Sequence, residues 1–502
     1  MMKKITLYIC SLLMVSLVSC EEELDQIPLS EASTANFYRT PAEFEQAING
    51  AYAQLRPFPD RYYDLSETRS DNIYGSSTTG VRPWDPVNDF ARTLSNNELI
   101  EAAWNQNFNG IMRANTVLDR LNADVVSDET QRNRLEGQAK FLRALYYFDL
   151  VRWYGKLPIY SSVVTPAAAL EIPRSSVPEV YDFIMSDLNS AMELLPDRWT
   201  GANVGRATSW AAKALLARVH LTRSGPDYGI EGPTLGVNEY DQALTLLNDI
   251  INNSHHAWVS DYASIFDYDN ENNPDIIFDV QFQSGGLGLG STLPGYMGVS
   301  SYFNTVPNIP SPQSSVEFRE ISDDLLNAYE PNDVRKAVTI QQGFTDDFGN
   351  VETRAFYRKF LNEANPGLDR FDWPINFPLI RYTDVLLMKA EAILRGGAGG
   401  GQQEVDDIVN MVRARAGLEP VSGVTLDMLL EERRLEFAGE GLRWHELVRF
   451  GKVIEKMNAW LPQEDELNRM PASIEPFNII YPIPFTQLTV KRGLYEQNAE
   501  YN

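Results

Sequence analysis

Cysteine is nearly absent from this chain of 502 residues, and its two cysteines, Cys10 and Cys20, both lie within the first twenty positions. A disulfide framework needs cysteines spread through the fold, and a cysteine-based metal site needs several thiolates close together. The chain beyond Cys20 can therefore form neither of these, whatever its tertiary structure.

Histidine is also scarce, and the four histidines are His220, His255, His256 and His445. They show no metal-binding spacing, and the chain lacks both an HExxH pair and a GxSxG nucleophile motif. The acidic run at residues 267–271 resembles a calcium loop. The positions that should carry glycine and glutamate hold Asn272 and Phe278 instead. We therefore expect no metal and no cofactor.

Basic residues are fewer than acidic ones. The chain has 43 Lys and Arg and 69 Asp and Glu, which gives a net charge of −26. A surface of that sign repels phosphate backbones, so nucleic acid is excluded as a partner. Beyond the N-terminus, no apolar run reaches the roughly eighteen residues that a membrane-spanning helix needs. The composition is otherwise that of a globular protein, with 43% hydrophobic residues.

The N-terminus reads as a secretion signal. Two lysines precede an apolar stretch at residues 5–18, which ends in Leu-Val-Ser-Cys20 and resembles a bacterial lipobox. We expect residues 1–19 to be removed and Cys20 to carry lipid. Residues 20–29, with their acidic run, would then form a tether. Cleavage of an ordinary signal nearby is the alternative.

Apolar residues recur at helical spacing along most of the chain. The most regular stretch, residues 130–154, ends at Gly155 and is predicted to be a helix buried on more than one side. The other predicted helices lie within residues 30–56, 98–122, 178–195, 205–221, 238–253, 379–395, 403–416 and 425–451, and one strand is predicted at 274–283. Two pairs of these helices resemble tetratricopeptide hairpins. The predicted fold is therefore mainly α, a superhelix of helical hairpins with large loop insertions and a few short strands.

Three segments, residues 57–97, 284–320 and 341–377, are rich in Gly, Pro and polar residues and are interleaved with aromatic rings. We interpret them as functional loop insertions. Trp84 stands between two prolines, which stiffen the backbone and so present the ring for stacking on a sugar. It could equally pack against a neighbouring helix. The candidate ligand-binding residues are Trp84, Tyr74, Asp71, Tyr296, Tyr302, Trp373 and Arg381.

No catalytic constellation is evident. The glutamates of residues 431–440 could be taken for the carboxylate pair of a glycoside hydrolase. The arginines of residues 433–443 would lower their pKa values, which is the wrong direction for a general acid, so a structural salt-bridge cluster is predicted. The glycines of residues 285–290 superficially resemble a nucleotide loop, but Pro294 follows where a helix should begin. We predict a binding protein and not an enzyme.

Four stretches carry a family resemblance: FYRTPAEFEQAINGAYAQLR (37–56), GQAKFLRALYYFDLVRWYGKLPIY (137–160), LLEERRLEFAGEGLRWHELVRFG (429–451) and YPIPFTQLTVKRGLYEQNAEY (481–501). They resemble the SusD/RagB family, the surface nutrient-binding lipoproteins of Bacteroidetes. The resemblance implies one SusD-like domain over residues 30–502. It also implies a lipid anchor in the outer membrane with the protein facing the cell exterior.

The same resemblance implies a function. Such a protein binds an oligosaccharide or polysaccharide and delivers it to a SusC-like TonB-dependent transporter, which it covers as a lid. A peptide-binding lid of the same architecture is the alternative, and a glycan-cleaving enzyme is a third. The loops that would select the ligand are the stretches in which the resemblance is weakest.

Overall fold

The computed structural model describes residues 37–77, 80, 82–306, 319–346 and 348–501. The predicted signal, the tether at residues 20–29 and the lipidation site Cys20 lie outside the described residues. Within the described ranges, no helix is long and apolar enough to cross a membrane.

The long helices of the scaffold are α2 (Pro41–Tyr52), α5 (Glu98–Arg120), α6 (Glu129–Tyr154), α8 (Val177–Leu194), α9 (Ser209–Arg223), α10 (Tyr240–Asn253), α14 (Tyr382–Leu394), α15 (Gln402–Arg415), α16 (Leu426–Phe437), α17 (Arg443–Phe450) and α18 (Val453–Glu464). The short helices are α3 (Phe58–Tyr62), α4 (Asp85–Asn88), α7 (Pro166–Ala169), α11 (Leu293–Met297), α12 (Asp323–Ala328), α13 (Val334–Thr339) and α19 (Phe485–Val490). The strands are β1 (Ile73–Tyr74), β2 (Ile276–Val280), β3 (Glu320–Ile321), β4 (Ile340–Thr345), β5 (Val351–Tyr357) and β6 (Phe377–Arg381).

The helix ends follow local sequence signals. Thr40 caps α2 in a capping box with Glu43, and Pro41 occupies the first turn, where a missing N–H costs nothing. Asp128 caps α6 by accepting a hydrogen bond from the N–H of Gln131, and Gly155 ends that helix with φ 70°. The helices predicted from periodicity are all present, with boundaries within a few residues of those expected.

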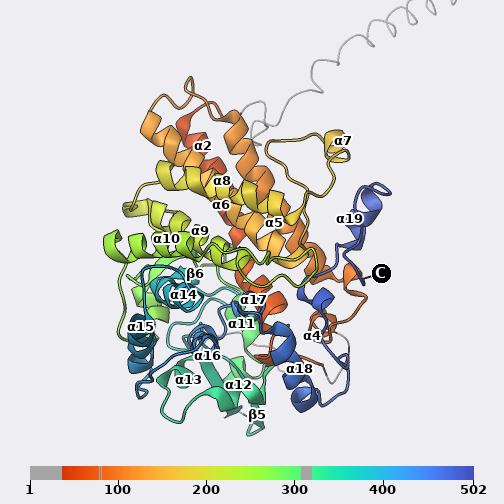
Figure 1. Ribbon diagram of the computed structural model, residues 1–502, viewed down its shortest axis with the longest axis vertical. Coiled ribbons are helices and arrows are strands. Elements are labelled where there is room, and N and C mark those ends of the chain that lie inside the picture. Colours follow the sequence, from red (N-terminus) through yellow and green to blue (C-terminus); the bar gives the residue numbers. More distant parts are fainter. Residues whose placement is uncertain (1–36, 78–79, 81, 307–318, 347, 502) are drawn as a thin grey trace, which may run out of the picture.

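The helices stack in an order close to that of the chain. Helix α6 packs against α5 and α8, α9 against α8 and α10, and α14 against α10 and α15. Figure 1 shows α2, α5, α6 and α8 in the upper part of the molecule and α14 to α16 below them. Each hairpin therefore buries its apolar face against the next one, which confirms the predicted helical superhelix.

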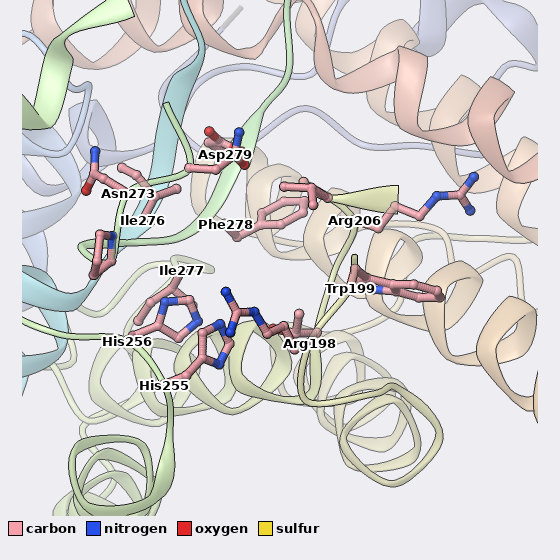
Figure 2. Close-up of a pocket in the computed structure, with 15 residues that line it drawn as sticks. Arg198, Trp199, Arg206, His255, His256, Asn273, Ile276, Ile277, Phe278 and Asp279 are labelled. Atoms are coloured by element: carbon pink, nitrogen blue, oxygen red, sulfur yellow. The ribbon is translucent and has the colours of Figure 1, made fainter. Parts of the chain in front are cut away.

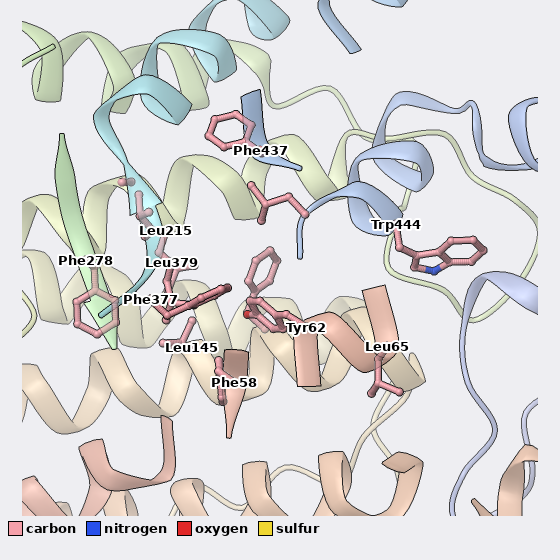
Figure 3. Packing of buried hydrophobic residues seen from close by; sticks show 14 of the residues in the cluster. Phe58, Tyr62, Leu65, Leu145, Leu215, Phe278, Phe377, Leu379, Phe437 and Trp444 are labelled. Atoms are coloured by element: carbon pink, nitrogen blue, oxygen red, sulfur yellow. The ribbon is translucent and has the colours of Figure 1, made fainter. Parts of the chain in front are cut away.

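Helix α6 lies at the centre of this stack, and every residue from Phe141 to Tyr154 is buried. Its charged residues are paired, because Asp149 accepts a hydrogen bond from Arg61 at 2.6 Å and Arg143 donates to Asp187 at 2.7 Å. Figure 3 shows how the core continues from this helix to rings on β2, β6 and the C-terminal helices. The prediction of a helix buried on more than one side is confirmed.

The insertions contain more structure than their composition predicted. Residues 57–97 form α3, a π-helical turn, β1 and α4, and most of the residues from 58 to 73 are buried. Residues 341–357 are mostly the antiparallel hairpin of β4 and β5. Short β1 pairs with β3 far along the chain, Ile73 lying opposite Ile321. The prediction of open loops was wrong here, because elements this short show no periodicity in sequence.

The C-terminal helices hold a network of buried ion pairs. Glu432 accepts from Arg335 at 2.6 Å, and Glu440 from both Lys359 and Arg381 at 2.9 Å. The glutamates of residues 431–440 are thus matched by cations, as the predicted salt-bridge cluster requires. The predicted lowering of the pKa holds for Glu436, where arginines outweigh burial, but not for Glu432, whose pKa burial raises despite Arg335.

Four other carboxyl groups, one buried and three partly buried, form no ion pair with any described residue. Burial is the main cause that raises the pKa values of Asp60, Glu271, Asp279 and Glu320 to about 7. The folded state retains protons on these groups that the unfolded chain releases above pH ~4. Their contribution to the free energy of unfolding is therefore largest at low pH and falls as the pH rises to about 7.

Replacing Asp279 with asparagine should remove the loss of stability at high pH from one such group, because asparagine stays uncharged at every pH. We expect Asp279→Asn to be more stable than the wild type at pH 8 by roughly 3 kcal/mol and to differ little at pH 4. Urea unfolding at the two pH values measures this difference. Asp407→Asn, at an exposed position, is the control and should change stability by no more than about 0.5 kcal/mol at either pH. Equal effects of the two substitutions would contradict the prediction.

Candidate functional site

Two of the predicted ligand-binding residues, Asp71 and Arg381, are buried ion-pair partners. Asp71 is 2% exposed, and its two carboxylate oxygens accept hydrogen bonds from Arg443 at 2.8 and 2.7 Å. Burial opposes its ionisation, but Arg434 and Arg443 outweigh that effect and lower the pKa of Asp71 below its usual range. Arg381 is also 2% exposed and contacts three carboxylates. The assumption that these side chains are exposed was wrong, since both are buried and their charges are paired within the fold.

Two predicted aromatic residues are also buried. Trp373 is fully buried, and its indole N–H donates to the carbonyl oxygen of Arg370 at 2.9 Å. Tyr302 packs between Phe344 and Phe356, and its hydroxyl donates to Glu363 at 2.5 Å. The assumption of exposed rings was wrong for both, because each fills the core beneath its loop instead of facing water.

Tyr74 is neither fully buried nor fully exposed. The residue is half-buried, and its hydroxyl donates to Asp465 at 3.2 Å while accepting from the N–H of Leu467 at 3.1 Å. Its polar group therefore ties β1 to the segment that follows α18.

Tyr296 and Trp84 are the predicted residues that remain accessible. Tyr296 is 48% exposed, and its ring centre lies 5.1 Å from that of Phe371. Trp84 is half-buried, with the guanidinium of Arg319 4.8 Å from the centre of its ring. Arg319 also acts electrostatically on Tyr296, as does Arg370, so the two predicted aromatics share charged neighbours.

We call this group of residues the aromatic rim and define it by Trp84, Tyr296, Arg319, Arg370 and Phe371. Arg319 itself is only 3% exposed and forms an ion pair with Asp64, so it supports the rings and does not face the surface. The guanidinium of Arg370 lies 4.4 Å from the ring centre of Phe371, and that of Arg319 lies 3.8 Å from the ring centre of Tyr63. Cations over ring faces hold the rings in place. Arg319, Arg370 and Phe371 were missed from the sequence, because no motif marks them.

Close backbone packing positions Tyr296. A Cβ on Gly295 would lie 1.9 Å from the carbonyl oxygen of Arg370, so only glycine lets α11 approach this loop. The hydroxyl of Thr292, just before α11, donates to the carboxylate of Asp60 at 2.5 Å. Both contacts join α11 to other segments and fix Tyr296 against Phe371.

A hollow of about 620 Å³ adjoins the rim, lined by residues 286–292 and 369–372. Within it, Asp372 accepts hydrogen bonds from the N–H groups of Gly285 and Gly286 at 2.9 and 3.0 Å. The chain's own carboxylate therefore occupies the amides of the glycine-rich loop. This arrangement explains physically why that loop is not a phosphate site.

Asp60 adds an unusual group beside the rim. Burial raises the pKa of Asp60 to about 7, and the Asp64 carboxylate adds to that effect. Its Oδ1 is buried and has no hydrogen-bond partner among the described residues. Aromatic faces beside guanidinium, hydroxyl and carboxyl groups are typical of a surface that binds a polar ligand with flat apolar patches, and a sugar is one such ligand.

The fold and this rim define a class of protein. Its members have a helical scaffold, and their inserted segments present an aromatic surface suited to a ligand. Residues 24–221 match a family model described as "Starch-binding associating with outer membrane", and residues 341–501 match the model of the SusD family. This chain belongs to the SusD/RagB family.

Individual relatives span nearly its whole length. A SusD-like protein of Formosa agariphila is 28% identical, over 97% of this chain and 98% of its own. The starch-binding protein SusD of Bacteroides thetaiotaomicron is 25% identical, over 78% of this chain and 76% of its own.

Solved structures agree with the fold. A laminarin-binding SusD-like protein is 26% identical with a TM-score of 0.75, covering 92% of this chain and all of its own. The surface glycan-binding protein A of Bacteroides thetaiotaomicron, in complex with laminarihexaose, is 23% identical with a TM-score of 0.76, covering 91% of this chain and 99% of its own. The latter likeness concerns the fold alone.

Proposed function

We propose that this protein binds an oligosaccharide or polysaccharide at the aromatic rim and delivers it to a SusC-like TonB-dependent transporter. The observation that carries the proposal is the exposed ring of Tyr296, held against Phe371, over whose ring Arg370 lies. Aromatic faces stack on the apolar side of a pyranose, while charged and hydroxyl groups bond to its hydroxyls. Relatives named for binding laminarin and starch support the same ligand class.

The proposed location follows from the N-terminus. The family description associates the matched region with the outer membrane. Cys20, at the end of a lipobox-like sequence, would provide the lipid anchor, and the acidic run after it would direct the protein to the cell exterior. Capture and hand-over require no bond to be made or broken, so the proposed role is binding and not catalysis.

The binding proposal predicts losses at two rim positions. In isothermal titration of the form starting at Glu21 against laminarin, starch and other glycans, Tyr296→Ala should weaken binding about tenfold, because a stacked ring is lost. Trp84→Ala should weaken glycan binding to a similar extent, because the guanidinium of Arg319 also loses the indole ring that it contacts. Phe348→Ala is the control, since Phe348 is 72% exposed on the β4–β5 turn and its loss should leave affinity unchanged.

The other outcomes are informative. Unchanged glycan affinity in both rim variants would remove the rim as the site. No binding to any glycan, with binding to basic peptides, would favour a peptide-binding lid, which the net charge of −26 would suit. Release of reducing sugar by the wild type would instead show a glycan-cleaving enzyme.

A further inference from the structure

A second cavity, of about 320 Å³, shares no residue with the rim (Figure 2). Three separate segments form it: the connection from α8 to α9 at residues 198–208, the turn after α10 that holds His255 and His256, and residues 272–279 around β2. Neither the sequence motifs nor the proposed glycan site assigns a role to this cavity.

One corner of the cavity gathers a guanidinium and two imidazole rings. Figure 2 shows Arg198, His255 and His256 pointing toward one another. The two imidazole ring centres are 4.2 Å apart. Burial, followed by the nearby His255, lowers the pKa of His256 to about 4. Such a corner disfavours any additional positive charge and favours a negative one.

Arg198 is the cation of this corner, and within the described residues it lacks a protein partner. Arg198 is exposed and forms no ion pair or hydrogen bond with any described residue, and the buried Nε2 of His256 is likewise without a partner in that part of the chain. Buried arginines such as Arg61, Arg143 and Arg335 are held by carboxylates. The guanidinium of Arg198 has no such carboxylate in the described part of the chain, and it lines the same cavity as the open ring nitrogen of His256.

The nearby acids form no ion pair with Arg198 within the described residues, although Asp197 acts electrostatically on His255. Asp197 accepts a hydrogen bond from Ser209 at 2.7 Å. Asp279, also in the lining, is buried and hydrogen-bonded to Gln281. Arg206, the other lining arginine, is already paired with Glu45 at 2.9 Å and so contributes no free charge.

An apolar wall stands beside the cationic corner. The indole N–H of Trp199 donates to the carbonyl oxygen of Ala207 at 2.7 Å, which fixes the ring. Ile277 and Phe278 also line the cavity. The cavity therefore offers one place for a negative group and another for an apolar body.

We propose that this cavity is a second binding site, for an oxyanion such as a carboxylate, sulfate or phosphate group. Arg198 supplies the charge and His255 and His256 supply ring N–H donors. The group reaches the site either as a free inorganic anion or on an acidic sugar, whose ring then packs against the apolar wall. The site does not depend on the aromatic rim.

The histidine rings report directly on occupancy. The form starting at Glu21 is followed by NMR of its imidazole signals, which His255→Gln and His256→Gln variants assign. Sodium sulfate, sodium phosphate, glucuronate and neutral glucose are added in turn at constant ionic strength kept with sodium chloride. We expect the signals of both histidines to shift saturably with at least one oxyanion and not with glucose.

Substitution distinguishes a site from general charge attraction. Arg198→Gln should weaken the oxyanion affinity about tenfold, because it removes one charge-assisted contact. Arg492→Gln removes an equal charge at an exposed residue outside the cavity lining and should have no effect. No saturable shift with any anion, or equal affinity in both arginine variants, would overturn the proposal.

Two further comparisons complete the test. Glucuronate binding about tenfold tighter than sulfate and phosphate would identify an acidic sugar as the ligand, and equal or weaker binding would identify a free anion. Tyr296→Ala should leave the histidine shifts unchanged, so failure of the rim as a glycan site would not count against this cavity. Loss of the shifts in that variant would contradict an independent site.

Discussion

Replacing Arg381 with alanine should destabilise the protein by about 4 kcal/mol. Its guanidinium donates to Asp275, Glu436 and Glu440 at 2.9, 3.0 and 2.9 Å, and all of these residues are buried. Alanine would leave three carboxylates with less compensating charge in a medium that solvates them poorly. Chemical unfolding at pH 7 measures the loss.

The pH dependence of that loss has a definite sign. Burial opposes ionisation of Glu436, but Arg415, Arg381 and Arg335 outweigh it and lower its pKa to about 2. The stability gained from this carboxylate is therefore present above pH ~4.3 and lost as the pH falls toward 2. The deficit of Arg381→Ala should consequently be smaller at pH 3 than at pH 7.

Arg358→Ala is the matched control, since it removes an arginine whose pair with Glu363 is about 30% exposed on both sides. We expect that variant to lose less than about 1 kcal/mol. A loss of that small size in Arg381→Ala as well would show that the buried network contributes little to stability.

Replacing Gly155 with alanine should cost roughly 3 kcal/mol. Gly155 ends α6 with φ 70° and ψ −115°, a conformation that residues with a Cβ rarely adopt. An added Cβ would also lie 1.8 Å from the carbonyl oxygen of Glu231. The neighbouring chain must then move away, and the end of the central helix must move with it. Thermal and urea unfolding both measure the effect.

Gly229→Ala separates the two causes. Gly229 has φ +71°, but an added Cβ there meets nothing within 4 Å. That variant should lose only about 1 kcal/mol, which is the cost of the backbone conformation alone. Equal losses in the two variants would mean that the contact with Glu231 is relieved at no cost.

The helices could be predicted because their signals are local. The stripe of α6, its cap at Asp128 and its end at Gly155 all lie within one short stretch of chain, so periodicity and capping chemistry were sufficient. The inserted segments gave no such signal. Their composition predicted loops, whereas β1 forms only by pairing with β3 some 250 residues later, which no local pattern reveals.

The same limit applies to the candidate site residues, whose exposure could not be predicted from local sequence. Tyr296 and Trp373 lie in segments of similar composition, yet one is 48% exposed and the other fully buried. Arg381 was predicted from its place beside an insertion, but its charge is matched by glutamates more than fifty positions further along the chain. Exposure depends on which distant segments come into contact, and composition carries no information about that.

The sequence by itself determined the helical scaffold, the acidic charge and the family resemblance, because each is written in short-range patterns or simple counts. Only the tertiary structure decided which side chains face water. It placed Phe371 and Arg370 against Tyr296 and brought Arg319 over Trp84. It also turned Asp71 and Arg381 inward, since a charge leaves water only where the folded chain supplies its partners.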